Sequence, residues 1–599
     1  MYSEAEKKLL LDAAIRAKEE SNSNAWSLLT EKLYQLEEDN IQYLCNYCEL
    51  LSQKNLHREA LALLQKHQGQ PTNHEEHYQL TTAQAKLHQQ LGNFDEATKL
   101  FRKATQDHAN NATSWLNQGL FLEAIGKTSE SEQSLAQANK IKPNTAEIIF
   151  SLIRLLEKND KQNEAQDILK ICQPNQWTEQ DLYFFIEALI KTGATKKAEV
   201  FLDEVHLNRD NEPKWRYLKA KSYLQCGNIS AYADLMEAMP EVLLEGNSRS
   251  KTEAVYSLFH AGETHRARQE LQTQLRMKHY DPRLHFISAH NLLLDAQYKE
   301  GWEQYEHRHA FATALHHQTH GIPLEKNLEG EDVLVIGEQG IGEMLFFSNF
   351  LDKFKDNVGS VAVLCEHKIG KLLANSFKTI RFIDNPEDLS IEDHQRTRIA
   401  IGSLPFYLYE RGYTDQELIK PVYTLHIAKQ KTQYWENWLK QNSVEKQVLK
   451  IGLSLQGGNK MDLLSSHARA INPELIFKTV PKGKAHFYDI QHNHNHEEIK
   501  VMANQYGHAI TDMRQVGTDL GQLAAFMKSL DLVITSQQTN AHLCGISQIP
   551  AFVLLPPFCH FAFGRKELSP WYPSLKLIRA KKPGNWIDGM ATICEALNL

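Results

Sequence analysis

The sequence predicts two kinds of architecture in one chain, an α-solenoid of repeated helix pairs followed by two doubly wound α/β domains. Three observations support this fold class. Small residues recur every 34 positions in the first half, short apolar runs alternate with helical segments in the second half, and that alternation restarts after a polar helix. We expect the solenoid at 1–308, a linker at 309–331, and α/β domains at 332–428 and 429–599.

The composition limits the class of protein. The chain has 599 residues, 42% hydrophobic and 23% charged, which predicts a folded soluble protein with several domains. A net charge of -8 argues against nucleic acid as the partner. We expect no membrane span, because no apolar run reaches about 20 residues. The N-terminus lacks a signal-peptide core, and the eight cysteines are scattered, so we expect a reducing, cytoplasmic location.

The repeats of the first half have a period of 34. Segment LGNFDEATKLFRKAT begins at Leu91 and IGKTSESEQSLAQAN begins at Ile125, so that Gly92 and Gly126 are 34 residues apart. Weaker copies are centred on Ala60, Ala165, Gly193, Gly227, Gly262 and Gly301. The glycine suits a tight turn between two helices, and a small residue in the second helix lets the first pack closely.

These features resemble the tetratricopeptide repeat over about residues 40–308. Stacked pairs of this kind form a concave groove that binds proteins or peptides, so we favour partner binding over a passive spacer or an oligomerisation arm. The pair Cys45 and Cys48 has metal or redox spacing, but it has no second pair nearby, and we expect ordinary packing.

The second half has strand candidates at 333–337, 361–365, 379–384, 398–402, 450–457, 486–491, 531–536 and 551–556. A helix rich in Lys and Trp, at about 428–446, separates the two sets. Strands that alternate with helices predict parallel sheets with right-handed crossovers. The ligand cleft is then expected at the carboxyl ends of the strands.

Five segments carry a family resemblance, in order: EGWEQYEHR from Glu300, GEQGIGEMLFF from Gly337, IGLSLQGGNK from Ile451 followed by HARAI, SLDLVITSQQTNAHLCGISQIP from Ser529, and FGRKELSPWYPSLKLIR from Phe563. Together they resemble tetratricopeptide-fused glycosyltransferases of the GT-B fold, in the group related to heptosyltransferases and O-GlcNAc transferases. Bacterial flagellin glycosyltransferases are the most similar members. With the repeats, the resemblance covers about residues 40–599.

The resemblance implies an inverting protein O-glycosyltransferase whose solenoid recruits an acceptor protein, flagellin by analogy with those members, and whose cleft uses a nucleotide sugar. It suggests a CMP-linked nonulosonic acid such as pseudaminic acid as the donor, and UDP-GlcNAc stays open. Such enzymes need no cofactor beyond this co-substrate. We find no D-x-D motif and expect no metal, although HNHNH at 492–496 has alternating histidines.

The segment after strand 531–536 is the expected donor site. A helix begins near Asn540, where free backbone N–H groups suit a phosphate, and Gln538, Thr539 and Asn540 can add side-chain hydrogen bonds. His542 is placed to touch or protonate the leaving phosphate; the alternative is a helix cap with His542 bonded to a backbone carbonyl. Relatives carry an acidic residue just before this turn, where this chain has Ser536 and glutamines.

Further donor-binding candidates follow the first strand of the second domain. The glycines allow close approach of the backbone, and the polar side chains suit phosphate or a donor carboxylate. Arg469 matches an arginine of the family, and Arg565 is another cation candidate, with a solvated surface charge as the alternative for each. The other members of this set are Gln456, Gly457, Gly458, Asn459 and Lys460.

The loop after the first strand lies on the expected acceptor side. Gln339, Gly340 and Gly342 form its turn, and Glu343 stands where relatives have an acidic residue. A carboxylate there can take the proton of an attacking hydroxyl, so Glu343 is the candidate general base and Glu338 the second candidate. The alternative for Glu343 is an acid favoured by the helix dipole.

Two other functions compete with this one. A catalytically decayed GT-B protein would act as a binding adaptor or a chaperone-like scaffold, an idea motivated by the missing acidic residue before QQTNAH. A transferase acting on lipopolysaccharide sugars is a third option, but a small glycan acceptor needs no long groove.

Overall fold

A computed structural model of the chain describes residues 2–597, apart from 20–22, 55, 68–70, 72, 160, 175–176, 210–212, 239–247, 278–280, 311–326, 420–423, 443–447, 458–462 and 493–494. The chain divides into two compact units, 1–207 and 208–599. Most of the expected linker at 309–331 lies outside the described residues, and the four domain bounds stay a prediction.

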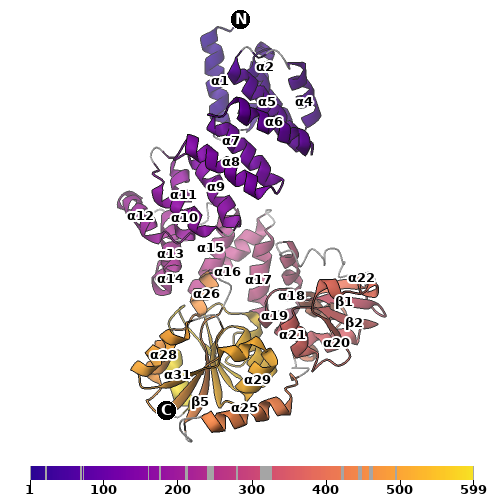
Figure 1. Ribbon diagram of the computed structural model, residues 1–599, viewed down its shortest axis with the longest axis vertical. Helices are drawn as coiled ribbons and strands as arrows, with labels where there is room; N and C mark the ends of the chain where they lie inside the picture. The colour runs from indigo at the N-terminus through magenta and orange to yellow at the C-terminus, as the bar shows by residue number, and fades with distance from the viewer. Residues whose placement is uncertain are drawn as a thin grey trace. The chain divides into compact units, whose positions relative to one another are not determined.

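The first unit is built of helix pairs (Figure 1). Its helices are α1 (Glu4–Glu19), α2 (Ser23–Leu36), α3 (Ile41–Gln53), α4 (His57–Lys66), α5 (His74–Gln90), α6 (Phe94–Asp107), α7 (Ala112–Ala124), α8 (Thr128–Ile141), α9 (Ala146–Lys158), α10 (Gln162–Ile171), α11 (Glu179–Lys191) and α12 (Thr195–Arg209).

Glycine makes the turns between paired helices, as the repeat pattern predicts. Gly92 and Gly126 have φ of +76° and +80°, a backbone conformation that costs other residues energy. After Gly92 the chain closes a helix-ending turn in which the N–H of Asn93 donates to the carbonyl of His88 at 2.9 Å. The small positions Ala97 and Ala165 of the second helices are fully buried, which confirms the tight packing.

The repeats continue in the second unit through α13 (Pro213–Gln225), α14 (Ile229–Glu237), α15 (Ser248–Ala261), α16 (Thr264–Arg276), α17 (Pro282–Leu294), α18 (Tyr298–Tyr305) and η1 (Glu306–Ala310). The last copy differs from the others. Ala296, with φ of +61°, makes its turn, and Gly301 lies inside α18 at the small position 34 residues after Ala267. A Cβ on Gly301 would lie 2.7 Å from the Leu293 side chain, so the two helices approach too closely for a larger residue.

The first sheet has four parallel strands in the order β3-β2-β1-β4. They are β1 (Asp332–Ile336), β2 (Ser360–Leu364), β3 (Arg381–Ile383) and β4 (Thr397–Ala400). The helical segments between and after them are α19 (Ile341–Phe347), η3 (Ser348–Phe350), α20 (Leu351–Lys355), α21 (His367–Leu373), η4 (Pro386–Asp388), α22 (Ile391–Gln395), η5 (Ile401–Ser403), α23 (Leu404–Glu410) and α24 (Asp415–Leu418).

The second sheet has six parallel strands in the order β10-β9-β8-β5-β6-β7, which is the doubly wound order of a dinucleotide-binding fold. They are β5 (Leu449–Ser454), β6 (Ala485–Asp489), β7 (Ala509–Asp512), β8 (Leu532–Ser536), β9 (Ala551–Leu555) and β10 (Leu575–Arg579). Its helical segments are α25 (Lys429–Asn442), α26 (Leu463–Arg469), α27 (Pro473–Thr479), α28 (His496–Gln505), η6 (Arg514–Thr518), α29 (Leu520–Lys528), α30 (Thr539–Ile546), η7 (Phe561–Phe563) and α31 (Ile587–Leu597). These topologies confirm the predicted fold class.

Both faces of the second sheet are covered, which explains its continuous apolar runs. Along β8, Val533 belongs to one core with Phe526 of α29, and Ile534 belongs to another with Phe477 of α27. The sheet was predicted from such runs, but β7 and β10 were not, because both are edge strands with exposed residues such as Lys576.

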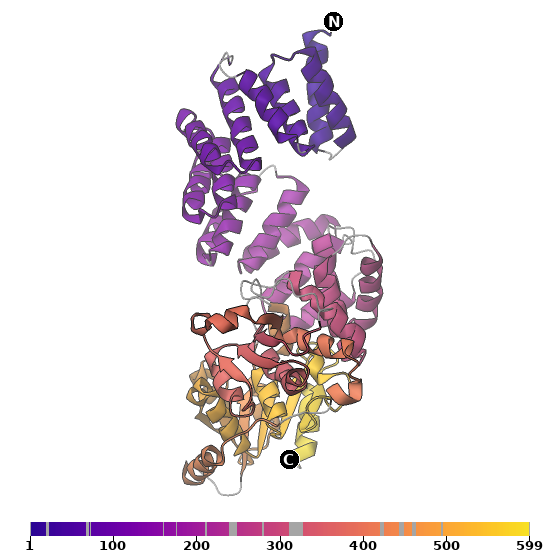
Figure 2. The same cartoon turned by 90° about the vertical axis from the view of Figure 1, so that its right-hand side faces the viewer.

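The last repeat packs directly against both sheets in the second unit. Trp302 of α18 is buried, with its ring centroid 5.9 Å from that of Phe347 in α19 and 5.3 Å from that of Phe561 in η7. Helix α17 also contacts η7, and both views show these last repeat helices beside the sheets (Figures 1 and 2). Searched over its described residues, the chain holds no helix with the length and apolar character of a membrane span.

Candidate active site

A cavity of about 240 Å³ lies where the last repeats meet the carboxyl ends of strands from both sheets. The loop after β1, helix α26 and the segments after β8 and β9 contribute one side of it, and α15 and α17 contribute the other. Ligands of doubly wound sheets bind at such strand ends, so this is the candidate active site.

Glu343 lies on this cavity, in the first turn of α19. Burial raises the pKa of its carboxyl group, while backbone hydrogen bonds at Glu343 itself and at Gly340 and the charge of Arg469 lower it, and the net shift is upward. The structure is therefore compatible with both roles predicted for Glu343, a general base at a cavity and an acid at the start of its helix. The carboxylate contacts the start of its helix, and it faces a cavity.

Gln339 precedes it on the same loop and also lines the cavity. Its φ is +62°, a left-handed conformation that costs a residue other than glycine on the order of 1 kcal/mol. The Gln339 side chain donates to the hydroxyl of Tyr305 at 2.6 Å, which holds the strained turn against the last repeat. Strain of this kind is concentrated at functional sites.

Arg469, at the end of α26, is the cation among the described residues that line the cavity. Its Nε donates to the Ser465 carbonyl at 3.1 Å, and its Nη1 donates to the Gln537 carbonyl at 3.2 Å. The guanidinium is thus fixed across the carboxyl ends of β5 and β8, opposite the charge of Glu343.

Two neutral histidines on the cavity present opposite hydrogen-bonding groups. The Nδ1 of His290 lies 3.1 Å from the Phe286 carbonyl and must carry the hydrogen, so its Nε2 is an acceptor. The Nδ1 of His560 accepts from the Ala562 N–H at 3.2 Å, so its Nε2 carries the hydrogen. Burial lowers the pKa of His290 to about 4 and that of His560 well below its usual value.

The start of α30 is occupied by internal contacts. Gln538 donates to the Ser454 carbonyl at 2.5 Å, and Asn540 donates to the Ser454 hydroxyl at 2.8 Å. His542 bonds the Tyr572 hydroxyl through Nδ1 at 2.9 Å, and burial lowers its pKa to about 3. A Cβ on Gly342 would lie 2.9 Å from His542, so α19 and α30 touch here.

His542 is therefore buried where α30 meets α19, and it is not among the described residues that line the cavity. This placement agrees with the alternative of a satisfied histidine, although its partner is the Tyr572 hydroxyl rather than a carbonyl. Thr539 begins the same helix and does not line the cavity.

The predicted loop after β5 is described only in part. The Gln456 N–H donates to the Gln491 side chain at 2.7 Å, and Gly457 lies against Gln538, where a Cβ would approach to 2.6 Å. Gly458, Asn459 and Lys460 lie outside the described residues.

Two predicted site residues lie away from the cavity. Glu338 is buried and accepts hydrogen bonds from Arg308 and from the Gly402 N–H at 2.8 Å, so its carboxylate holds the end of β1 in place. Arg565 bonds Asp295 of the last repeat at 2.5 Å. Sequence position alone could not reveal that both residues form ion pairs with the last repeat.

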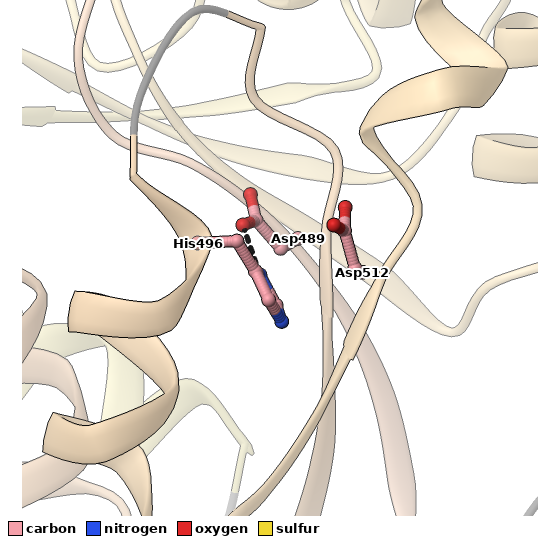
Figure 3. Close-up of side chains that lie close together, drawn as sticks. All are labelled: Asp489, His496 and Asp512. Carbon is pink, nitrogen blue, oxygen red and sulfur yellow. Dashed lines mark hydrogen bonds and ion pairs between the residues drawn. The ribbon is translucent and has the colours of Figure 1, made fainter.

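The segment HNHNH contributes to one close group of side chains. The Nδ1 of His496 lies 2.7 Å from Asp489, and Asp512 lies beside them (Figure 3). Arg514 donates to both Asp512 oxygens, at 2.9 and 2.7 Å, and so offsets the negative charge of that carboxylate. His492 is exposed and His494 lies outside the described residues.

Several cavity residues were not predicted from the sequence: Tyr256, Phe286, His290, Phe558 and His560. The first three belong to repeat helices, where aromatic residues indicate ordinary packing. Phe558 and His560 could have been found from the sequence, because the aromatic segment PPFCHFAF follows a strand of a parallel sheet, where ligands bind.

No protein-family model matches the chain. Over 336 residues, 52% of its length, it is 26% identical to Protein FlbA of Caulobacter vibrioides, and it spans about half (54%) of that relative.

Solved structures that share similarity with the chain include the following two. A glycosyl transferase family 9 protein from Veillonella parvula is 11% identical, with a TM-score of 0.33, over 46% of this chain and 93% of that one. The tetratricopeptide protein TTC0263 from Thermus thermophilus is 19% identical, with a TM-score of 0.27, over 31% of this chain and 99% of that one. These values describe similarity and do not assign a family.

Proposed function

We propose that the protein is a glycosyltransferase that transfers a sugar from a nucleotide-activated donor to a serine or threonine hydroxyl of an acceptor protein. The observation that carries the proposal is the cavity at the carboxyl ends of strands from both parallel sheets, with Glu343 and Arg469 on its wall. The family resemblance of the sequence supports the reaction class.

The chemistry assigns one step to each charged group. The acceptor oxygen attacks the anomeric carbon and loses its proton to the Glu343 carboxylate, while the sugar–phosphate bond breaks and the nucleotide leaves with the electron pair. Burial raises the pKa of Glu343, which makes its carboxylate a stronger base toward the hydroxyl proton. Arg469 offsets negative charge on the donor or the leaving group. No metal ion enters this scheme.

The donor class follows from the cavity lining. Arg469 suits an acidic group, and the opposite hydrogen-bonding groups of His290 and His560 suit sugar hydroxyls. A CMP-linked nonulosonic acid such as pseudaminic acid, which carries a carboxylate, is the first candidate, and UDP-GlcNAc is the comparison. Flagellin, recruited by the repeats in the cytoplasm, is the proposed acceptor on the strength of the sequence resemblance.

The test combines purified protein, flagellin and each donor, with the intact mass of flagellin as the readout. We expect a mass increase of one sugar residue with the acidic donor, and its loss with Glu343→Gln. Glu387→Gln, an exposed carboxylate of the same sheet domain, is the matched control and should transfer normally. Equal transfer by wild type and Glu343→Gln would remove the base role.

The alternative is a binding adaptor without transferase activity. One observation favours it: the side chains of Gln538 and Asn540 donate hydrogen bonds to Ser454 at the place where a donor phosphate is expected to bind. Calorimetry with CMP, UDP and their sugar conjugates separates the two functions. Flagellin binding without binding of any nucleotide sugar would establish the adaptor.

A further inference from the structure

A second cavity, of about 390 Å³, lies in the unit 208–599 and shares no lining residue with the candidate active site. Three separate stretches of the chain form it: α21 with the residues that follow it, the segment 426–431, and the start of α29.

The charge of this cavity is strongly one-sided. Four lysines line it, Lys368, Lys371, Lys378 and Lys431, against the single carboxylate of Asp519. Four positive charges minus one negative charge leave an excess of three, in a chain whose net charge is -8. The cavity therefore has the opposite sign to the protein as a whole.

The existing ion pairs do not use all of these lysines. Asp519 pairs with Lys371 at 3.0 Å and with Lys431 at 3.7 Å. Within the described part of the chain, Lys368 and Lys378 form no hydrogen bond or ion pair. His367 also lines the cavity and already pairs with Asp384 at 2.6 Å.

The start of α29 adds to the positive potential. Asp519 is its N-cap and accepts from the Gln522 N–H at 3.0 Å, and the first-turn residues Leu520 and Gly521 line the cavity. The positive end of the helix dipole is therefore directed to the same space as the lysines. Leu372 and Ile427 supply apolar surface beside them.

Solvated surface lysines are the competing explanation. That explanation accounts for lysines spread along one helix, whereas here lysines of α21, of the segment after it and of the first turn of α25 line one concave space. Phosphate groups are the ligands that lysine ammonium groups bind as point charges. We propose that this cavity binds a small ligand carrying two or more phosphate groups.

Site-resolved acetylation tests the proposal without relying on transferase activity. The protein is treated with limiting acetylating reagent at rising pyrophosphate or ADP concentration, and each lysine is quantified by mass spectrometry. We expect protection of Lys368, Lys371 and Lys378 at concentrations that leave Lys478 unprotected. Lys478 is an exposed lysine of α27 and serves as the internal control.

Two variants should change the half-protecting concentration in opposite directions. Lys368→Ala combined with Lys378→Ala should raise the half-protecting concentration at Lys371 by about tenfold or more. Asp519→Asn keeps the helix cap and removes the carboxylate, so it should lower that concentration by about threefold or more. Lys478→Ala should leave it unchanged.

The two probes distinguish the sources of the phosphate groups. Protection by ADP at lower concentration than pyrophosphate identifies a nucleotide that also contacts Leu372 and Ile427, and equal protection identifies the phosphate groups alone. No protection by either probe, or equal protection of Lys478, overturns the proposal. The result is independent of the proposed transfer reaction, because no lysine measured lies on the candidate active site.

Discussion

Arg308 and Glu338 form a buried ion pair, with an N–O distance of 2.5 Å, between the last repeat and the end of β1. Their side chains are 2% and 0% exposed. Arg308 also donates to Ser403 at 2.9 Å and to Glu306 at 2.8 Å, so one guanidinium joins the repeat to two strand ends of the first sheet.

Replacing Arg308 by Met should destabilise the protein strongly, by about 3–5 kcal/mol, because it leaves the Glu338 carboxylate buried without its cation. Lys299→Met is the matched control. Lys299 of α18 pairs with Glu410 of α23, but both side chains are exposed, so the loss should be below about 1 kcal/mol. The measurement is the denaturant midpoint of the full chain, and equal midpoints for the two variants would contradict the structural role of Arg308.

Glu338→Gln should leave the pH dependence of transfer unchanged while it lowers the melting temperature, because Glu338 lies away from the cavity. Transfer rates per folded molecule against pH provide the check. A shifted pH profile would restore Glu338 as a candidate base.

Glu343→Gln should lower transfer by about 10²–10⁴-fold and remove the acidic limb of the pH profile. Burial raises the pKa of this carboxyl, and a base acts only when deprotonated, so wild-type activity should fall as the pH drops through that raised pKa. A falling limb that persists in the variant would assign the titration to another group.

His290 should make the folded state sensitive to acid. Its pKa is about 4 when folded, against a usual value of 6.5, so the unfolded chain takes up the proton first. The contribution of neutral His290 to the free energy of unfolding is complete above pH 6.5 and is lost as the pH falls to about 4. The pKa difference corresponds to about 3 kcal/mol. His290→Gln should reduce the change in melting temperature between pH 7 and pH 5, and an unchanged slope would contradict this.

The turn glycines should tolerate substitution in a defined order. Gly126 has φ of +80° and open space around its Cα, so strain alone decides the cost. We expect Gly126→Ala to cost about 1–2 kcal/mol and Gly126→Asn less, because Asn visits this conformation more readily. Gly517→Ala is the control, with open space and no positive φ, and melting temperatures should follow this order.

The sequence was most informative where structure depends on local rules. The 34-residue spacing from Gly92 to Gly126 reports a turn conformation that glycine adopts, and apolar runs such as that of β8 report burial on both faces. Edge strands β7 and β10 carry neither signal. Gly301 was assigned to the series correctly but serves as a packing position, because a missing Cβ has two distinct uses in a repeat.

The candidate site depended on contacts that no local pattern records. Glu338 and Glu343 are both acids near the end of β1, and only the position of Arg308 separates their roles. His290 and Phe286 have the appearance of ordinary repeat residues, and they reach the cavity because α17 packs against the segment after β9.

The lining of the cavity by α15 and α17 has a consequence for dissecting the chain. Every lining residue lies between Tyr256 and His560, so the repeats of 1–207 can be shortened, lengthened or exchanged without altering the cavity wall. A fragment cut at the expected linker would instead lose one wall of the cavity. Because α26, which carries the cavity residue Arg469, contacts α13 as well as α15, a chimera that is to keep the cavity should be joined before α13.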